Sequence, residues 1–514
     1  MNAKLNKSDV INYVGLALMG LYCFGSATVT NYFAQLHIQL PFLDFPIFIG
    51  EMLIGVCLIL WLLNNFQKIK NLNILHYCVF AYFIFVIVKA FYGYVKWGPL
   101  AFRNAALFYY PIFIIFGSSF FRRKYFGKIC SVLLVLFISI LFIMDFYDFY
   151  FQFTLLSLGI ILASSYPNRI ISCLCYILLL CGTNFLAFFQ TSRSLIVGNT
   201  SAFIFLLILS MVIISCRKAI KFLIIGIGVI LVVVGLSQFT TEYAKTMFKF
   251  ESFVARFQEV DKIIQAELPE YKRFEPEKIM LYSEEKVVSA YWMEGLKAEQ
   301  LDARLKDVKI DGNFQETFED ENLITAFALG AYHKNVFDKG LSRKTPMEMH
   351  YYLSPEKRIA KSTTVATNNV IFRLLIWRDM FKELFASRNI LGMDFGYPLL
   401  SPSLDIMNWG RSEWTRDGWV GVHNSYFHWI YRSGIVGVLM VIGLFGLFIR
   451  TTLAFIKYRS FAGIVLCSIL VNWFMASNFL LTLELPYTAI PIWSILGLTL
   501  GHLREVKEKH AKAC

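Results

Sequence analysis

The sequence predicts an all-α integral membrane protein with about 12 transmembrane helices and a mostly helical extracytoplasmic domain between the ninth and tenth helices. Three observations support this fold class. Hydrophobic residues make up 57% of the 514 residues, and Phe alone occurs 50 times. Apolar runs of about 18 or more residues recur, and a helix of that length crosses a bilayer. One long polar segment, residues 241–422, interrupts these runs.

The apolar runs divide the chain into three parts. Nine predicted spans fall within residues 1–240, the polar domain occupies residues 241–422, and three more spans fall within residues 423–514. The predicted spans cover residues 11–30, 42–63, 74–92, 103–120, 128–146, 149–165, 170–189, 194–215, 219–238, 424–449, 460–481 and 487–503.

The distribution of Lys and Arg predicts how these spans are oriented. With the N-terminus in the cytoplasm, the cytoplasmic loops and ends carry 19 basic residues. The short outer loops and nearby helix ends then carry four, which are Lys89, Lys96, Arg103 and Arg193. Basic residues are concentrated on the cytoplasmic side of membrane proteins. Both termini are therefore predicted to be cytoplasmic, and residues 241–422 to lie on the outer side of the membrane.

The net charge of +13 belongs to the membrane part of the chain. Residues 241–422 hold 28 acidic and 25 basic residues, so the remainder carries a net charge of +16. Basic loops that set topology account for this excess, and we expect no nucleic-acid partner. None of the ten cysteines lies in residues 241–422, which excludes a disulfide framework there.

The polar segment is too long to lack structure of its own. Apolar residues at helical spacing predict an amphipathic helix over residues 246–267 and a second helix over residues 363–387. Residues 284–306 and 318–330 are weaker helix candidates, and residues 389–421 are rich in Gly and Pro turns. The expected apolar face of the helix over 363–387 consists of Val370, Leu374, Trp377, Phe381 and Leu384 or Phe385.

The sequence lacks the common motifs for nucleotide and metal chemistry. It contains no P-loop, no H-E-x-x-H motif and no Asp-x-Asp pair, so we expect neither a metal site nor a cofactor. The outer surface of the membrane also has no supply of ATP. A transfer reaction there needs a substrate that arrives already activated, for example as a lipid-linked diphosphate.

Four arginines lie at predicted outer boundaries, where such a diphosphate would bind. They are Arg103, Arg193, Arg373 and Arg432. The guanidinium group matches phosphate oxygens with two parallel hydrogen bonds. The alternative for each is an interfacial arginine bonded to backbone carbonyls or to a structural acid.

His423 stands at the entry to the tenth predicted span, followed by Asn424. An imidazole that titrates near neutral pH accepts a proton from a hydroxyl nucleophile. Asn424 either orients this imidazole or caps the helix, since Asn is a favoured N-cap residue. A histidine that only bonds a carbonyl is the structural alternative.

Three short blocks of the sequence occur in a characteristic order. They are TSRS at residues 191–194, FRLLIWRDMFKELFASRNILGMDFG at 372–396 and HNSYFHWIYRSGIVG at 423–437. Together with the long outer segment before the tenth span, they resemble the O-antigen ligase and O-antigen polymerase superfamily. The first block resembles its [TS]-x-S-R segment, the second its R-x(3)-W and G-x-G-x-G block, and the third its H-N-x-Y-[LF] and G-[IL]-x-G signature. GMDFG departs from the glycine pattern.

The resemblance implies a metal-independent glycosyltransferase of the bacterial inner membrane. Such an enzyme moves a saccharide from an undecaprenyl-diphosphate donor to a hydroxyl of a saccharide or lipid A core acceptor at the periplasmic face. By matching motif, Arg193 and Arg373 would stabilise the diphosphate and His423 would be the general base. Additional substrate-binding candidates are Arg103, Arg432, Asn424, Trp377 and Tyr426.

Three alternatives remain open on the sequence. The same chemistry with another acceptor makes the protein a repeat-unit polymerase. A lipid-linked saccharide flippase or transporter would also have many spans and outer arginines, but it commonly has two related halves, and we find no such internal similarity. A scaffold in an envelope-polysaccharide complex would depend on the outer domain and not on the arginines.

Overall fold

The computed structural model describes residues 7–28, 33–34, 36–38, 40, 47–65, 74–98, 100–122, 129, 193–213, 251–270, 365–397, 399, 401–406, 422–480 and 482–513. These residues are mostly helical, as predicted. The one sheet among them pairs β1 (His37–Ile38) antiparallel with β2 (Ile47–Phe48).

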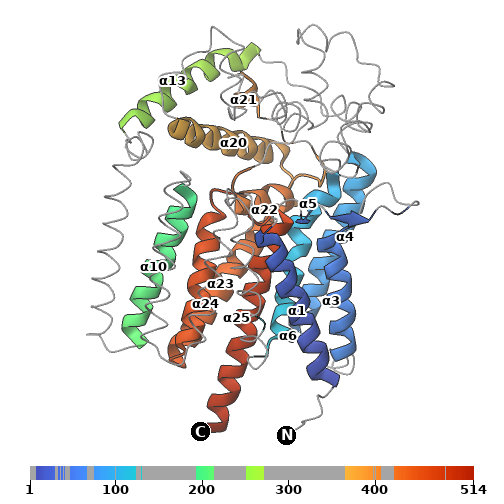
Figure 1. Cartoon of the computed structure of the whole chain (residues 1–514). Helices are drawn as coiled ribbons and strands as arrows, with labels where there is room; N and C mark the ends of the chain where they lie inside the picture. The colour runs from blue at the N-terminus through green and yellow to red at the C-terminus, as the bar shows by residue number, and fades with distance from the viewer. Residues whose placement is uncertain are drawn as a thin grey trace.

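Most of the described helices stand side by side in one bundle (Figure 1). α1 begins and α25 ends at the same, lower end of this bundle in the view of Figure 1. Six helices coincide with predicted spans: α1 (Lys7–Thr28), α3 (Ile49–Asn65), α4 (Ile74–Trp97), α10 (Arg193–Ile213), α24 (Phe461–Ala476) and α25 (Pro486–Ala513).

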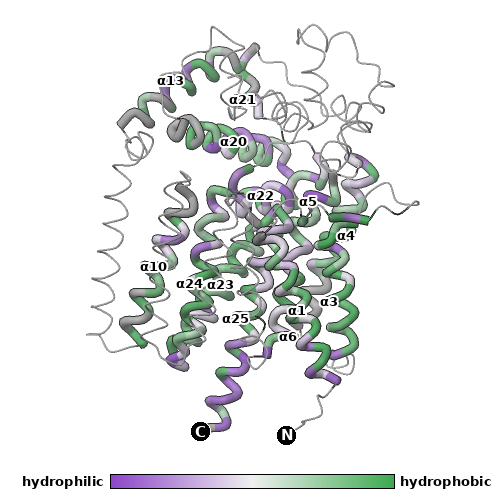
Figure 2. Tube along the Cα trace, viewed as in Figure 1, coloured by the Kyte–Doolittle hydropathy of each residue, from purple (hydrophilic) through white to green (hydrophobic). Residues whose placement is uncertain are grey.

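Two of the described helices are long and apolar enough to cross a membrane, Lys7–Ser26 within α1 and Ile435–Lys457. Shorter apolar helices cover Ile49–Asn65, Val197–Leu206 and Phe461–Ala476. The hydropathy pattern in Figure 2 is consistent with this, since the bundle helices are largely hydrophobic and the projecting end of α25 is hydrophilic. The predicted spans at 128–146, 149–165, 170–189 and 219–238 lie outside the described residues.

Two predicted spans are broken helices in the structure. The span predicted at 103–120 consists of α5 (Leu100–Tyr109), the 3₁₀ helix η2 (Tyr110–Ile112) and α6 (Phe113–Phe120). The break coincides with Pro111, which has no N–H for a helical hydrogen bond. The span predicted at 424–449 is divided at Gly434, whose φ of 53° ends α22 (Ser425–Ser433) before α23 (Ile435–Lys457) begins.

Glycines and tryptophans bring the bundle helices together. A side chain on Gly117 of α6 would lie 2.7 Å from Ser494 O, and one on Gly497 of α25 would lie 2.5 Å from Ile114 O. The two helices therefore cross at backbone contact, as small residues permit in membrane bundles. Nearby, the ring of Trp429 stacks on that of Trp493 with centroids 5.7 Å apart.

A second layer covers the end of the bundle at which α5 and α22 lie (Figure 1). It consists of α13 (Glu251–Glu267), followed by the 3₁₀ helix η3 (Leu268–Glu270), then α20 (Val365–Ser387) and α21 (Pro402–Ile406). α13 and α20 agree with the helices predicted over 246–267 and 363–387. The weaker candidates at 284–306 and 318–330 lie outside the described residues.

The predicted apolar face of α20 needs a correction. The buried apolar side chains are Ile371, Phe372, Leu375, Ile376, Met380 and Leu384, whereas Phe385 is exposed. Val370, Leu374, Trp377 and Phe381 are only half-buried. The reason is that α20 lies between two partners: its buried residues share a core with α13 and α21, and Trp377 and Phe381 pack on Phe427 of α22.

Candidate functional site

The two glycine-containing blocks of the sequence contact each other directly. Gly392 and Gly434 both have positive φ, 72° and 53°, and a Cβ atom on either would overlap the backbone of the other's segment. Met393 N donates to Tyr431 O (2.8 Å), and Ile435 N donates to Ile390 O (2.9 Å). Glycine is required here because no other residue permits this approach and this φ together. The turn after α20 is thereby attached to the junction of α22 and α23.

His423 lies just before α22. Asn424 caps α22, with Oδ1 accepting from Tyr426 N (3.1 Å) and Phe427 N (3.0 Å). The structure thus shows the capping role that was predicted for Asn424. His423 itself has φ of 50°, a left-handed conformation that is uncommon for residues other than glycine. It precedes α22 and lies outside the two described helices that are long and apolar enough to cross a membrane.

α20 brings Arg373 close enough to His423 for its charge to affect the pKa of the imidazole, although the two residues are 50 positions apart in the sequence. Trp377 Nε1 donates to Val422 O (2.7 Å), and the ring of Phe372 meets that of His423 with centroids 6.1 Å apart. Burial lowers the pKa of His423 to about 3, and the positive charge of Arg373 contributes to this decrease. The imidazole is therefore neutral at pH 7 and has a cation close by.

Arg193 lies at the end of the bundle at which α22 begins. Asn472, near the end of α24, donates to Asn199 Oδ1 of α10 (2.9 Å). Ser477, just past α24, accepts from Ser425 N at the start of α22 (3.0 Å). The first turns of α10 consequently lie at the end of the bundle where α22 starts, and Arg193 is the first residue of α10.

Arg103 lies on α5, next to a residue that contacts the glycine-containing segment after α20. Its neighbour Asn104 accepts from Gly396 N through Oδ1 (2.9 Å). Gly396 has φ of 83°, and a side chain on it would lie 2.7 Å from Trp97 Cβ. The half-buried Arg103 is thus positioned on the element that supports the turn.

The remaining predicted binding residues have structural partners. Trp377 uses its only donor on Val422 O, as described above. The buried Tyr426 hydroxyl donates to Phe474 O (3.0 Å). Arg432, also buried, donates from Nη1 to Asp394 O (2.8 Å) and Tyr397 O (2.7 Å). These contacts, with the cap made by Asn424, give all four residues a role in holding the site together.

Arg432 belongs to a buried chain of charged and polar groups that the sequence patterns do not reveal. Its Nε donates to His428 Nε2 (3.2 Å), and His428 Nδ1 lies 2.9 Å from Glu484 Oε1. Since Nε2 accepts, the neutral tautomer of His428 carries its proton on Nδ1, facing the carboxylate. The sequence signal is modest: His428 and Arg432 share a helix face at i, i+4, whereas Glu484 is distant in the chain.

Two lysines of α4 also contact the segment that follows α20. Lys89, which is buried, donates to Leu391 O and lies 5.4 Å from the ring centroid of Phe395. Lys96 Nζ lies 3.2 Å from Asp394 Oδ2. The sequence signal for Lys89 is a lone cation in an apolar run, where an ionisable residue commonly has a specific role.

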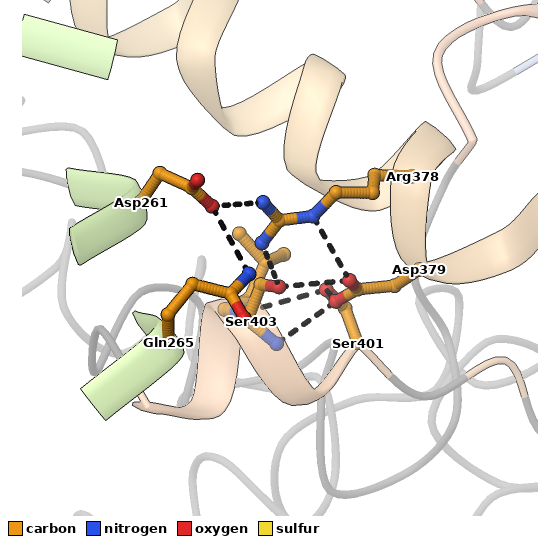
Figure 3. Close-up of polar contacts among 7 residues, drawn as sticks. Asp261, Gln265, Arg378, Asp379, Ser401 and Ser403 are labelled. Atoms are coloured by element: carbon orange, nitrogen blue, oxygen red, sulfur yellow. Dashed lines mark hydrogen bonds and ion pairs between the residues drawn. The ribbon is translucent and has the colours of Figure 1, made fainter. Parts of the chain in front are cut away.

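A polar cluster attaches α20 to the outer helices (Figure 3). Arg378 donates to Asp261 of α13 and to Ser403 Oγ of α21 (2.8 Å). The buried carboxylate of Asp379 accepts from Ser401 Oγ (2.7 Å), Ser403 N (2.8 Å) and Ser403 Oγ (2.8 Å). α20 is therefore fixed from above by this cluster and from below by α22, which determines where Arg373 is presented.

The arrangement can combine proton transfer with stabilisation of an anion. A neutral imidazole accepts a proton, and an adjacent guanidinium binds phosphate oxygens. Within the described residues, no group of three or more His, Cys, Asp or Glu side chains is placed to hold a metal ion.

The chain matches no protein-family model, no curated protein and no solved structure. The resemblance to the O-antigen ligase and polymerase superfamily therefore remains a prediction based on the three sequence blocks.

Proposed function

We propose that this protein is a multi-pass membrane glycosyltransferase of the O-antigen ligase type, with about 12 spans and cytoplasmic termini. It transfers a saccharide from an undecaprenyl-diphosphate donor to an acceptor hydroxyl at the periplasmic face. The observation that supports it best is that Arg373 lies close enough to His423, across 50 residues of sequence, for its charge to affect the pKa of His423, next to the contact between Gly392 and Gly434.

In this proposal, His423 Nδ1 or Nε2 accepts the proton of the acceptor hydroxyl as its oxygen attacks the anomeric carbon of the donor sugar. The bond from that carbon to the phosphate oxygen breaks, and the electron pair leaves with undecaprenyl diphosphate. Arg373 stabilises the charge that develops on the diphosphate, and Arg193 is the second candidate for this role.

The bound diphosphate also explains how a histidine with so low a pKa becomes an effective base. An anion close to an imidazole favours its protonated form. The diphosphate would counter the charge of Arg373 and raise the pKa of His423 in the complex. The imidazole would then be neutral before substrate binds and more basic once the donor is in place.

The proposal is tested with the full-length protein in vesicles, supplied with lipid-linked donor and acceptor in excess EDTA. His423→Asn retains a residue that tolerates the left-handed backbone and should lower the transfer rate about 100-fold or more, as loss of a general base does. Arg373→Gln should also lower the rate about 100-fold or more. The matched controls are His510→Asn and Arg450→Gln, at exposed positions on α25 and α23.

Full activity of His423→Asn would rule out the proposed base. Offering lipid A core and lipid-linked repeat units separately distinguishes ligase from polymerase by which of them is extended. Translocation of the lipid without transfer would instead identify a flippase.

A further inference from the structure

The turn at residues 389–392 exposes large apolar side chains between two long helices. Ile390 is 74% exposed and Leu391 is 49% exposed. The bond from Ile435 N to Ile390 O places the turn beside the first residue of α23. The bond from Lys89 Nζ to Leu391 O places it beside α4. A surface of this kind needs a covering partner.

The surfaces that continue from this turn are also apolar. On α4 the exposed residues include Ile84, Val88, Phe91 and Val95, and on α23 they include Ile435, Leu439 and Ile442. In the proposed orientation these side chains face lipid, and the turn forms part of the same surface.

The position of the turn along α4 also indicates that lipid covers it. α4 rises about 1.5 Å per residue, so Val95 lies about 9 Å farther toward its outer end than Lys89. Val95 is apolar and 86% exposed. The Lys89 contact therefore holds the turn below the outer limit of the exposed apolar surface of α4, and not above it.

Most backbone groups of the turn are bonded to protein groups. Leu391 N donates to Asn389 Oδ1 (3.0 Å), and Gly392 N donates to Asn389 O (3.0 Å). The carbonyls of Leu391 and Gly392 both accept from Lys89 Nζ. With the bonds of Ile390 O and Met393 N given above, six consecutive backbone groups have partners. Non-helical backbone at membrane depth requires such pairing, because hydrocarbon supplies no hydrogen bonds.

The charges beside the turn match a lipid surface. Arg388 precedes the turn and Lys382 lies on the last turns of α20, and both are exposed. Long basic side chains next to an apolar tip reach phosphate head groups while the tip stays in hydrocarbon.

We propose that residues 389–392 insert into the outer leaflet of the membrane, with Ile390 and Leu391 contacting lipid acyl chains and Arg388 at the phosphates. This rests on the membrane orientation of the proposed function, but not on its transfer chemistry. The inserted turn anchors the end of α20 to the bilayer and so keeps Arg373 at a constant height above it.

The test uses the photo-crosslinking amino acid p-benzoylphenylalanine in the full-length protein, in vesicles of phosphatidylethanolamine and phosphatidylglycerol. It replaces Ile390 in one variant, Leu439 of α23 in a second and the exposed Gln258 of α13 in a third. All three positions are at the surface, so the fold should tolerate the change. Mass spectrometry should detect lipid adducts at 390 and 439 with a yield on the order of tenfold above that at 258, because hydrocarbon surrounds only the first two.

Adducts at 439 without adducts at 390 would overturn the proposed insertion and leave the membrane orientation intact. A protein–protein adduct at 390 would assign the surface to a second copy of the chain and would also overturn it. Absence of lipid adducts at both positions would overturn the orientation itself. Loss of saccharide transfer has no bearing on any of these results, so the two proposals fail separately.

Discussion

Acid should destabilise this protein through His423, and the structure indicates by how much. Burial, together with the charge of Arg373, lowers the pKa of His423 from 6.5 to about 3. In the unfolded chain the imidazole takes up a proton below about pH 6.5, whereas the native protein resists protonation until about pH 3. The unfolded state therefore binds more protons in this window, and native stability falls as the pH is lowered.

The magnitude follows from the width of the window. At about 1.4 kcal/mol for each pH unit, the contribution of the half-buried His423 to the free energy of unfolding falls by at most about 2 kcal/mol at pH 5 and at most about 4 kcal/mol near pH 3. It is fully present above about pH 6.5. Asn at this position cannot be protonated and tolerates the left-handed backbone, so His423→Asn should not show this decrease.

Thermal unfolding in detergent between pH 4 and pH 8 measures the effect as a difference between the wild-type and His423→Asn curves. Arg373→Gln should reduce the acid-dependent loss without abolishing it, because burial is the larger cause. His510→Asn, which changes an exposed histidine, should follow the wild-type curve. Parallel curves for wild type and His423→Asn would show that His423 is not buried in its neutral form.

Two further substitutions test how the site is held. Gly434→Ala should destabilise the protein by at least about 2 kcal/mol, because the added Cβ atom would overlap Ile390 O at a backbone position with positive φ. Thermal unfolding measures this loss against the control Gly443→Ala on α23. A Cβ atom at 443 meets nothing within 4 Å, so this control should be neutral or slightly stabilising. Asp379→Asn should cost about 2–4 kcal/mol and increase hydrogen exchange in α20 and α21, because the serine donors lose their charged acceptor. Unchanged exchange there would contradict the role given to this carboxylate.

The helices were the most predictable part of this protein. Apolar periodicity over residues 363–387 is a local property, and α20 (Val365–Ser387) agrees with it closely. The predicted apolar face was less accurate, since that face depends on which elements cover the helix, and α20 is covered from two sides. The breaks at Pro111 and Gly434 were missed because a hydropathy average does not register a lost hydrogen bond or a positive φ.

The candidate site was predictable only as a set of residue types. Arginine and histidine at a predicted outer boundary indicate phosphate binding and proton transfer wherever they occur, because guanidinium and imidazole have those properties in any fold. The partners of Trp377, Tyr426 and Arg432 could not be predicted in this way, since each bonds a backbone carbonyl that belongs to another element.

The sequence by itself determined the helical class, the polar segment and the order of the three blocks, since these depend on composition and local spacing. Only the tertiary structure decided that the charge of Arg373 acts on His423, and that Lys89 and Arg432 bond the backbone of the segment after α20. The physical reason is that such contacts join residues far apart in the chain. Their formation depends on how α20 docks on α22, through Trp377, Phe427 and the close approach of Gly392 to Gly434.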